Sequence, residues 1–231
     1  MTVTGAPREP LLEGSQSDEQ PTDGRRARGL RSRGAILERS VQLASKEGLE
    51  GLTIGGLAGE LDVHKSSVFA LFGSKLDLQL ATLEAARRIL IEQVIAPSLS
   101  SEQGMPRLRA IGDAWFSYLA SDVFAGGCFL SAASTEMDGR PGPLRDAVRE
   151  VMGEWMAVLE ANIEAAMAAG DLPKATNSSA LAFRLNALGM AANWQRQLLE
   201  DLAGIDYARA AWGAELGNGK PVSAGKGRPR R

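Results

Sequence analysis

A short stretch around residue 65 carries the side chains that are best placed for chemistry. In LDVHKSSVFALFGSK, Leu61 to Lys75, apolar residues recur at helical spacing while Lys and Ser side chains share the other face. Lys65, Ser66 and Ser67 stand at the start of the expected helix, where side chains reach outward and free backbone N–H groups suit a phosphate. This polar face predicts binding of an anionic polymer.

Catalytic and metal-binding patterns are weak by comparison. His64 is the only histidine, and its place at a helix start favours a capping or polymer-facing role over a metal site or a Ser-His-Asp triad. Paired acids such as Glu160 and Glu164 have no matching His or Cys and resemble solvated faces. No GxGxxG or GxxxxGK[ST] phosphate loop is present. We therefore predict a protein that is not an enzyme and needs no cofactor or metal.

Composition narrows the class of protein further. The chain has 231 residues, of which 44% are hydrophobic and 23% charged, a balance typical of globular domains with a substantial core. No apolar run reaches the roughly 18 residues that a membrane span needs, and the first residues lack a secretory signal. Cys128 is the only cysteine, so we expect a reducing, cytoplasmic location. A buried small hydrophobe is the favoured role for its thiol, ahead of a pocket-lining or redox-sensing one.

Charge is segregated along the chain despite a net value of −2. Residues 1–24 carry one basic and five acidic residues, whereas 25–79 carry nine basic and six acidic. Residues 80–218 carry eleven basic and seventeen acidic residues, and 219–231 carry five basic and none acidic. Two basic pieces on an acidic body indicate an anionic polymer as partner, although charge alone does not separate nucleic acid from a membrane surface.

The pattern of apolar residues and breaks predicts an all-α fold. We expect disorder in 1–24, a small helical domain in 25–79, a larger helical domain in 80–218 and an unstructured basic tail in 219–231. In the small domain Gly48 would end the first helix and Thr53 would cap the second. The expected helices cover about 31–47, 54–61, 65–72, 75–95 (stopped by Pro97), 106–120, 127–137, 142–169, 177–200 and 205–215.

Three short helices with a tight turn before the third match a helix-turn-helix, whose third helix lies in the major groove of DNA. The polar face of Lys65, Ser66 and Ser67 would then meet base edges. Thr53 and Lys75, each at the start of an adjoining helix, would hold the flanking phosphates and fix register rather than sequence.

Residues 31–83 resemble the N-terminal domain of the TetR family of transcriptional regulators. The resemblance includes the Gly48 stop, the Thr53 cap, the Ile54, Leu57 and Ala58 stripe, Val63, Phe69 and the FGSK step from Phe72 to Lys75. Further on, GGCFLSAASTEMDGRPGPLRDAV, Gly126 to Val148, is similar to the ligand domain of one TetR subgroup. The resemblance implies a homodimer that binds a palindromic double-stranded DNA operator and leaves it when a small-molecule inducer enters the C-terminal domain, with no membrane partner.

Three positions depart from the family pattern. His64 stands where a Ser N-cap is usual, Phe69 where a Tyr hydroxyl often reaches a phosphate, and Leu71 where His or Tyr is common. Each change removes a polar contact and weakens the expected affinity for DNA. We expect the basic arm GRRARGLRSR, Gly24 to Arg33, to compensate through residues that include Arg31 and Arg33, either along the DNA backbone or in the minor groove.

For the larger domain the resemblance places an inducer among the helices. Candidate pocket residues are the large apolar side chains Trp115, Leu119, Phe129, Trp155, Leu159, Phe183 and Met190. Asn186 and Asn193 share one helical face and suit either the pocket or the seam between two chains. For that seam we expect the helices at 142–169 and 177–200, with the stripe Leu181, Leu185, Leu188 and Ala192.

Two alternatives remain open. A constitutive DNA-binding protein would keep the helix-turn-helix but have a filled core and no inducer. A helical ligand-binding protein with weakened DNA binding would account for the missing polar groups at Phe69 and Leu71. The tail KGRPRR, Lys226 to Arg231, resembles an AT-hook, although a solubilising tail is the favoured interpretation.

Overall fold

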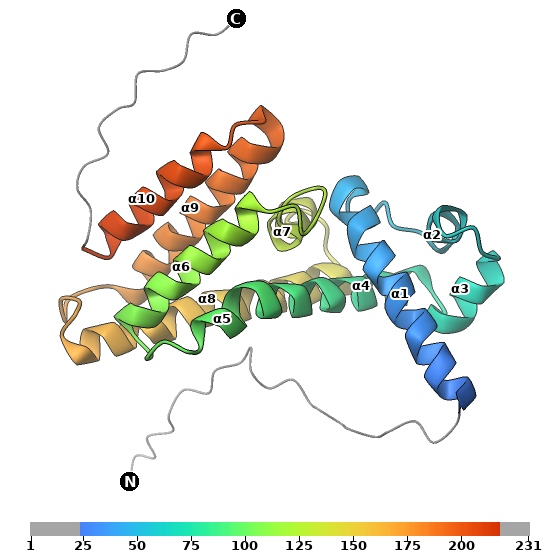
Figure 1. Ribbon diagram of the computed structural model, residues 1–231, viewed down its shortest axis with the longest axis horizontal. Coiled ribbons are helices and arrows are strands. Elements are labelled where there is room, and N and C mark those ends of the chain that lie inside the picture. The colour runs from blue at the N-terminus through green and yellow to red at the C-terminus, as the bar shows by residue number, and fades with distance from the viewer. Residues whose placement is uncertain (1–23, 218–231) are drawn as a thin grey trace, which may run out of the picture.

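A computed structural model describes residues 24–217, with side chains described from Arg33 onward. Every regular element in that range is helical, which confirms the all-α prediction (Figure 1). None of the described helices is long and apolar enough to cross a membrane. In chain order the elements are α1 (Gly24–Glu47), α2 (Ile54–Glu60), α3 (Lys65–Phe72), α4 (Lys75–Leu90), η1 (Ile91–Ile95), α5 (Ala96–Ser98), α6 (Met105–Ala120), α7 (Phe129–Met137), α8 (Pro143–Ala169), α9 (Ser178–Leu199) and α10 (Ala203–Glu215).

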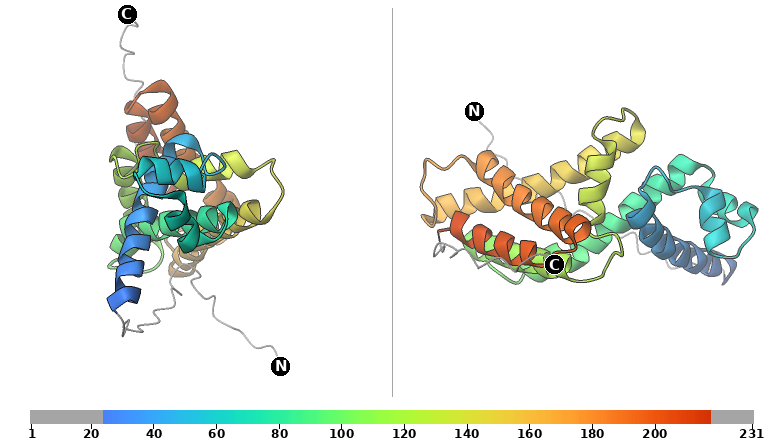
Figure 2. Two further views of the ribbon diagram at one scale, coloured as in Figure 1. Left: turned by 90° about the vertical axis from the view of Figure 1, so that its right-hand side faces the viewer. Right: turned by 90° about the horizontal axis from the view of Figure 1, so that it is seen from above.

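Helices α1, α2 and α3 pack around a small apolar core at one end of the elongated molecule (Figure 2). Val41 on α1, Leu57 on α2 and Val68 on α3 are each almost completely buried there. The turn between α2 and α3 is tight because Asp62 adopts a left-handed conformation, with φ of 54°, which Asp tolerates better than most residues. This is the predicted helix-turn-helix arrangement.

The first helix begins earlier than the sequence indicated. We expected a helix from about Arg31 preceded by a basic arm, but α1 starts at Gly24 and incorporates that arm. Arg, Ala and Leu are good helix formers, so the segment extends the helix toward its N-terminus. The predicted disordered segment before it and the basic tail that was predicted to be unstructured lie outside the described residues.

Side-chain caps fix the starts of two helices, and the first of them is the predicted cap at Thr53. Thr53 Oγ1 accepts a hydrogen bond from the backbone N–H of Gly56 at 3.0 Å at the start of α2. Ser74 Oγ accepts from the N–H of Asp77 at 3.0 Å at the start of α4. Between them Gly73, with φ of 79°, ends α3. These caps set the directions of the two helices that flank α3.

Helix α4 runs from the small domain into the larger one and continues through η1, a turn of π-helix. The expectation that Pro97 stops the helix is wrong, because the helical path extends through α5 to Ser98. Pro97 lies in the first turn of α5, where a backbone N–H has no intrahelical partner to lose. The π-turn just before Pro97 changes the backbone hydrogen-bonding pattern, which allows the helix to accommodate this residue.

The larger domain is built around aromatic side chains from α6, α8 and α10. The ring centroids of Trp115 and Trp155 lie 4.8 Å apart, and Trp212 completes the cluster against Phe116 at 5.7 Å. Trp115 also packs directly on the backbone of α9, since a Cβ added at Gly189 would lie 2.1 Å from its ring. Tight packing of this kind holds α9 and α10, which run side by side, against the rest of the domain (Figure 1).

Candidate nucleic-acid interface and internal pocket

Helix α3 presents one apolar face inward and one polar face outward. Val68 and Phe72 are buried, whereas Lys65, Ser66 and Ser67 are exposed at the start of the helix. Lys65 forms no hydrogen bond or ion pair with another described residue, so its ammonium group is available to a ligand. The geometry thus brings together the three side chains that the sequence singled out.

His64 occupies the N-cap position of α3 but its side chain makes no capping hydrogen bond. The imidazole is exposed beside Lys65. No group of three or more His, Cys, Asp or Glu side chains in the described part of the chain could hold a metal ion. The capping role considered for His64 is therefore wrong, and the DNA-facing role stays a prediction.

Lys75 is engaged within the chain. Its ammonium Nζ donates to Glu50 Oε1 at 2.8 Å. The hydrogen bond from Lys75 lowers the pKa of Glu50 from its ordinary value of 4.5, and this outweighs the opposing effect of burial. A depressed carboxyl pKa means that the pair contributes at neutral pH and is lost as the pH falls below that ordinary value. Glu50 consequently competes with a phosphate for Lys75.

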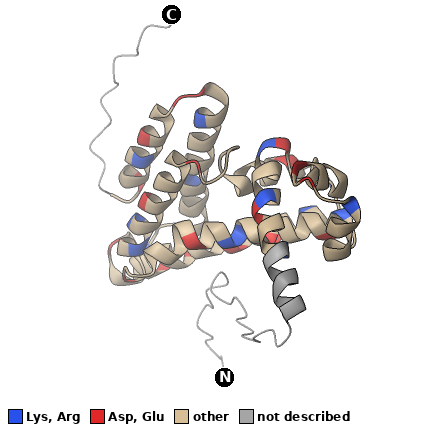
Figure 3. Ribbon diagram, turned by 45° about the vertical axis from the view of Figure 1, so that its right-hand side comes forward, with Lys and Arg blue, Asp and Glu red and all other residues tan. Residues whose placement is uncertain are grey.

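Two arginine side chains of α1 also interact with other residues of the chain. The guanidinium of Arg33 lies over the ring of Phe72, 5.1 Å from its centroid, and Arg39 pairs with Glu60. Arg31 lies in the part of α1 whose side chains are not described. Charges of both signs are spread over the described part of the domain (Figure 3), so a strongly basic patch is not formed by the described side chains.

An internal pocket lies among α4, α6, α7, α8 and α9 in the larger domain. Its free volume is about 10 Å³, which is room for one water molecule at most. Trp155 Nε1 donates to Asn186 Oδ1 at 3.0 Å at its edge. The pocket is lined by Leu90, Trp115, Cys128, Leu130, Ser131, Met152, Trp155 and Asn186. In this conformation the interior is closed.

The pocket candidates from the sequence are only partly brought together. Trp115 and Trp155 line the pocket, whereas Leu119, Phe129 and Leu159 are buried in the surrounding core. Two further candidates lie elsewhere. Met190 lines an open groove between α7 and α9, and the placement of Phe183 inside the domain is wrong because its side chain is 67% exposed on α9.

Helix α9 is apolar on both faces, and its outer face differs from the expected seam. The expected stripe, Leu181, Leu185, Leu188 and Ala192, packs into the chain's own core. Exposed large side chains instead lie on the opposite face of α9, at Phe183, Trp194 and Leu198, and further ones lie at the C-terminal end of α9, in the turn before α10 and on α10. We call them the outer stripe: Phe183, Trp194, Leu198, Leu199, Leu202 and Tyr207. None of the exposed large hydrophobic side chains in the described chain belongs to α8, and the seam expected at the helix 142–169 stays a prediction.

A link between the two domains was missed by the sequence analysis. The carboxylate of Glu136, on α7, accepts hydrogen bonds from the backbone N–H groups of Leu49 at 2.7 Å and Glu50 at 2.9 Å. Leu49 and Glu50 belong to the loop that follows α1. No local sequence signal marks Glu136, because its partners lie more than eighty residues away.

Comparisons with known proteins agree with this architecture. Residues 104–212 match the family model "Tetracyclin repressor-like, C-terminal domain". No match is found among curated protein sequences.

Three solved structures illustrate the shared fold. A TetR transcriptional regulator from Chloroflexus aurantiacus is 21% identical, with a TM-score of 0.77 over 84% of this chain and 98% of that chain. AibR, solved with isovaleryl coenzyme A and operator DNA, is 18% identical, with a TM-score of 0.65 over 78% and 96%. A regulator from Saccharomonospora viridis, solved with choline, is 18% identical, with a TM-score of 0.68 over 80% and 95%.

These likenesses extend over the helix-turn-helix domain and the larger helical domain together, and the family model falls within the larger one. The fold agrees with the resemblance that the N-terminal residues indicated. The larger domain is similar to the C-terminal domain of tetracycline repressor-like proteins, and the described chain as a whole shares the fold of TetR-family transcriptional regulators.

Proposed function

We propose that the protein acts as a homodimeric repressor that binds a two-fold symmetric operator and releases it when a small molecule occupies the larger domain. The observation that carries this proposal is the exposed polar face of α3, where Lys65, Ser66 and Ser67 stand clear of the core. Side chains at the N-terminal end of a recognition helix reach base edges in the major groove. Thr53 and His64 would contact the flanking DNA from either side.

The outer stripe supports the dimeric part of the proposal. Monomeric proteins rarely expose several large apolar side chains close together on one surface, and a second copy of the same surface would cover them. A two-fold pairing through α9 and α10 places one helix-turn-helix domain on each side of the axis. Two recognition helices about 34–36 Å apart would then enter successive major grooves.

Solved relatives support the ligand-responsive part. AibR was solved with an acyl coenzyme A and operator DNA, and the S. viridis regulator with choline. We propose a small molecule for this chain as well, held near Trp115, Trp155 and Asn186. Because the pocket has room for no more than one water molecule, such a ligand must displace side chains as it binds.

A second candidate function is favoured by the same closed pocket. A constitutive DNA-binding regulator needs no inducer, and a filled interior is what it would show. A thermal-shift screen against metabolites separates the two. Hits whose binding lowers DNA affinity support the ligand-responsive repressor, whereas a screen without hits and with unchanged DNA affinity supports the constitutive protein.

The experiment that tests the proposal is selection of an operator from random duplex DNA by the purified protein. We expect a sequence with two inverted half-sites, bound by two chains in sedimentation analysis. A monomeric protein that enriches no sequence at low salt would overturn the proposal.

Removing the Glu50 charge is expected to strengthen contact with the DNA backbone. In Glu50→Gln the ammonium of Lys75 loses its anionic partner and becomes free to bind a phosphate. Each added phosphate contact steepens the dependence of log K on log salt by about 0.9, so a dimer gains about 2 in slope. Fluorescence anisotropy across a salt series measures this. Glu38→Gln, at an exposed position on α1, is the matched control, and equal slopes for both variants would contradict the prediction.

Restoring a hydroxyl at Phe69 is expected to tighten operator binding. The Phe69 ring is 54% exposed on α3, where its outer edge would lie near the DNA backbone. Phe69→Tyr adds a hydrogen bond to a phosphate, which we expect to tighten binding about tenfold, or about 1.4 kcal/mol, without a change in salt slope. Phe69→Leu, which lacks the hydroxyl, should show no gain. A Tyr variant with wild-type affinity would refute the placement of this residue.

A further inference from the structure

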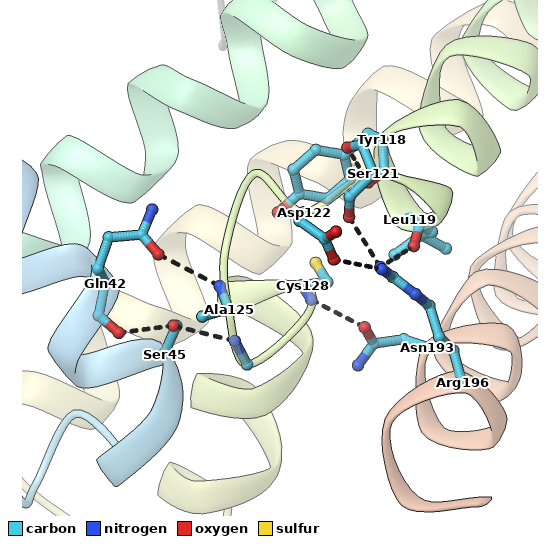
Figure 4. A network of polar contacts seen from close by, with 11 residues as sticks. Gln42, Ser45, Tyr118, Leu119, Ser121, Asp122, Ala125, Cys128, Asn193 and Arg196 are labelled. Carbon is cyan, nitrogen blue, oxygen red and sulfur yellow. Dashed lines mark hydrogen bonds and ion pairs between the residues drawn. The ribbon is translucent and has the colours of Figure 1, made fainter. Parts of the chain in front are cut away.

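The loop between α6 and α7, residues 121–128, lies between α1 of the DNA-binding domain and α9 of the larger domain (Figure 4). We call it the spacer loop. Hydrogen bonds join it to both helices, so it connects the helix that carries the outer stripe with the domain that carries α3.

On the side of α1, Gln42 and Ser45 hold the backbone of the spacer loop. Gln42 Nε2 donates to the carbonyl oxygen of Val123 at 2.7 Å, and Gln42 Oε1 accepts from the N–H of Ala125 at 3.2 Å. Ser45 Oγ accepts from the N–H of Gly126 at 3.2 Å. Both ends of the Gln42 amide are used, which fixes its orientation and the separation of α1 from the loop.

On the side of α9, Asn193 and Arg196 hold the same loop. Asn193 Oδ1 accepts from the N–H of Cys128 at 2.8 Å. The Arg196 guanidinium donates to the carbonyl oxygens of Leu119 and Ser121 and to the Asp122 carboxylate. The Arg196 side chain is only 13% exposed, whereas the side chain of its partner Asp122 is 90% exposed. A partly buried charged donor with three partners gives a rigid attachment.

Two adjacent glycines set the thickness of the spacer loop. A Cβ added at Gly126 would lie 1.7 Å from the carbonyl oxygen of Ser45, on α1. A Cβ added at Gly127 would lie 2.6 Å from Gln197 Cγ, on α9, and Gly127 has a φ of +82° that favours glycine. The loop backbone therefore touches α1 on one side and α9 on the other, with no room for a side chain.

We infer that the spacer loop sets the position of each helix-turn-helix domain relative to α9, and through α9 the separation of the two recognition helices. This inference rests on the proposed dimer for its effect on DNA. Asn193 and Arg196 flank Trp194 of the outer stripe, so the surface proposed to join two chains and the residues that hold the loop share one turn of α9. Gln42, Gly126, Asn193 and Arg196 are thus positioning residues for operator spacing, although none of them touches DNA.

The direct test measures the distance between the domains within one chain. Spin labels are placed at Ser67 on α3 and at Arg149 on α8, both exposed, in a Cys128→Ser background and diluted with unlabelled chain. Gly126→Ala must move α1 away until the new methyl group reaches ordinary contact distance, so we expect the mean label distance to shift by about 2 Å or more. Gly153→Ala, where nothing lies within 4 Å, is the matched control and should leave the distance unchanged.

Gln42→Ala provides a second variant that loosens the attachment instead of wedging it. It removes both amide contacts with the spacer loop and should broaden the distance distribution without shifting its mean. If Gly126→Ala fails to fold, the label-distance distribution of Gln42→Ala decides whether the inference holds. Wild-type distance distributions in every folded variant would overturn the inference, whatever happens to DNA binding.

The functional readout is a series of selected operators whose half-sites are separated by different numbers of base pairs. We expect Gly126→Ala to change which spacing binds best, and Gln42→Ala to reduce the discrimination between spacings by about fivefold or more, comparable with the cost of one mismatched base pair. A uniform loss of affinity at all spacings would mean a merely structural role and overturn the inference. If the wild-type protein selects no operator, the proposed function fails, and the label distances still decide whether the loop is a spacer.

Discussion

Trp194→Asp is expected to separate the dimer and abolish tight operator binding. Trp194 is 55% exposed in the middle of the outer stripe, and a large aromatic side chain at the centre of an interface typically carries about 2–4 kcal/mol of binding free energy. Replacing it with a carboxylate adds the cost of desolvating an unpaired charge. We expect operator affinity to fall about a hundredfold or more, because one half-site alone binds weakly. Sedimentation velocity and anisotropy with operator DNA measure the two effects.

Leu99→Asp is the matched control for this change. Leu99 is also an exposed large hydrophobic residue, at 37%, but it follows α5 and is not part of the outer stripe. This variant should remain dimeric and bind operator like the wild type, and both variants should keep the helical circular dichroism of the native chain. A Trp194→Asp protein that stays dimeric with normal affinity would exclude the outer stripe as the seam.

Glu136→Ala is expected to detach the loop after α1 from the larger domain. Two backbone N–H groups, of Leu49 and Glu50, lose a charged acceptor, and hydrogen bonds to charged groups contribute about 1.5–3 kcal/mol each. Because Glu136 is partly exposed, we expect a total loss of about 2–4 kcal/mol in the stability of the helix-turn-helix domain. Hydrogen exchange at the Leu49 and Glu50 amides should accelerate accordingly, and the thermal unfolding of this domain should begin at a lower temperature.

Two further variants serve as controls for this role of the Glu136 carboxylate. Glu136→Gln keeps one acceptor oxygen and should lose about half as much stability as the Ala variant. Glu150→Ala, which changes an exposed acid on α8 that has no hydrogen bond to this loop, should behave like the wild type. Unchanged exchange at both amides in Glu136→Ala would show that the carboxylate does not stabilise the loop.

Most helix boundaries could be predicted because local chemistry sets them. Thr53 and Ser74 cap helices with their own side chains, and Gly73 and Gly170 adopt the positive φ that ends a helix. Such signals lie within a few residues of the boundary they fix.

The orientation of α9 could not be predicted, because large apolar side chains lie on two opposite faces of this helix. Leu181 and Leu185 face the core while Phe183 and Trp194 face outward, and both sets recur at helical spacing. Periodicity identifies a buried face only when the opposite face is polar. The same ambiguity placed Phe183 in the pocket and assigned to a chain-to-chain seam a stripe that packs in the chain's own core.

Contacts between distant segments were also beyond sequence reasoning. Glu136 meets Leu49, and Gln42 meets the spacer loop, across more than eighty residues in each case. The sequence indicated the types of these residues but not their partners, since only the packed fold brings them together. The closed pocket and the pairing of Lys75 with Glu50 also depend on the packed fold, so the local sequence gives no signal for either.

The closed interior has a consequence for how sensitive a regulator of this design can be. A chain that binds its effector only after Trp115, Met152 or Trp155 has moved spends most of its time in a form that cannot accept the effector. Its apparent affinity is the intrinsic affinity reduced by the fraction of molecules that are open at any moment. The threshold concentration of such a sensor is therefore governed by how firmly its aromatic side chains are packed, and not only by the contacts that the effector makes.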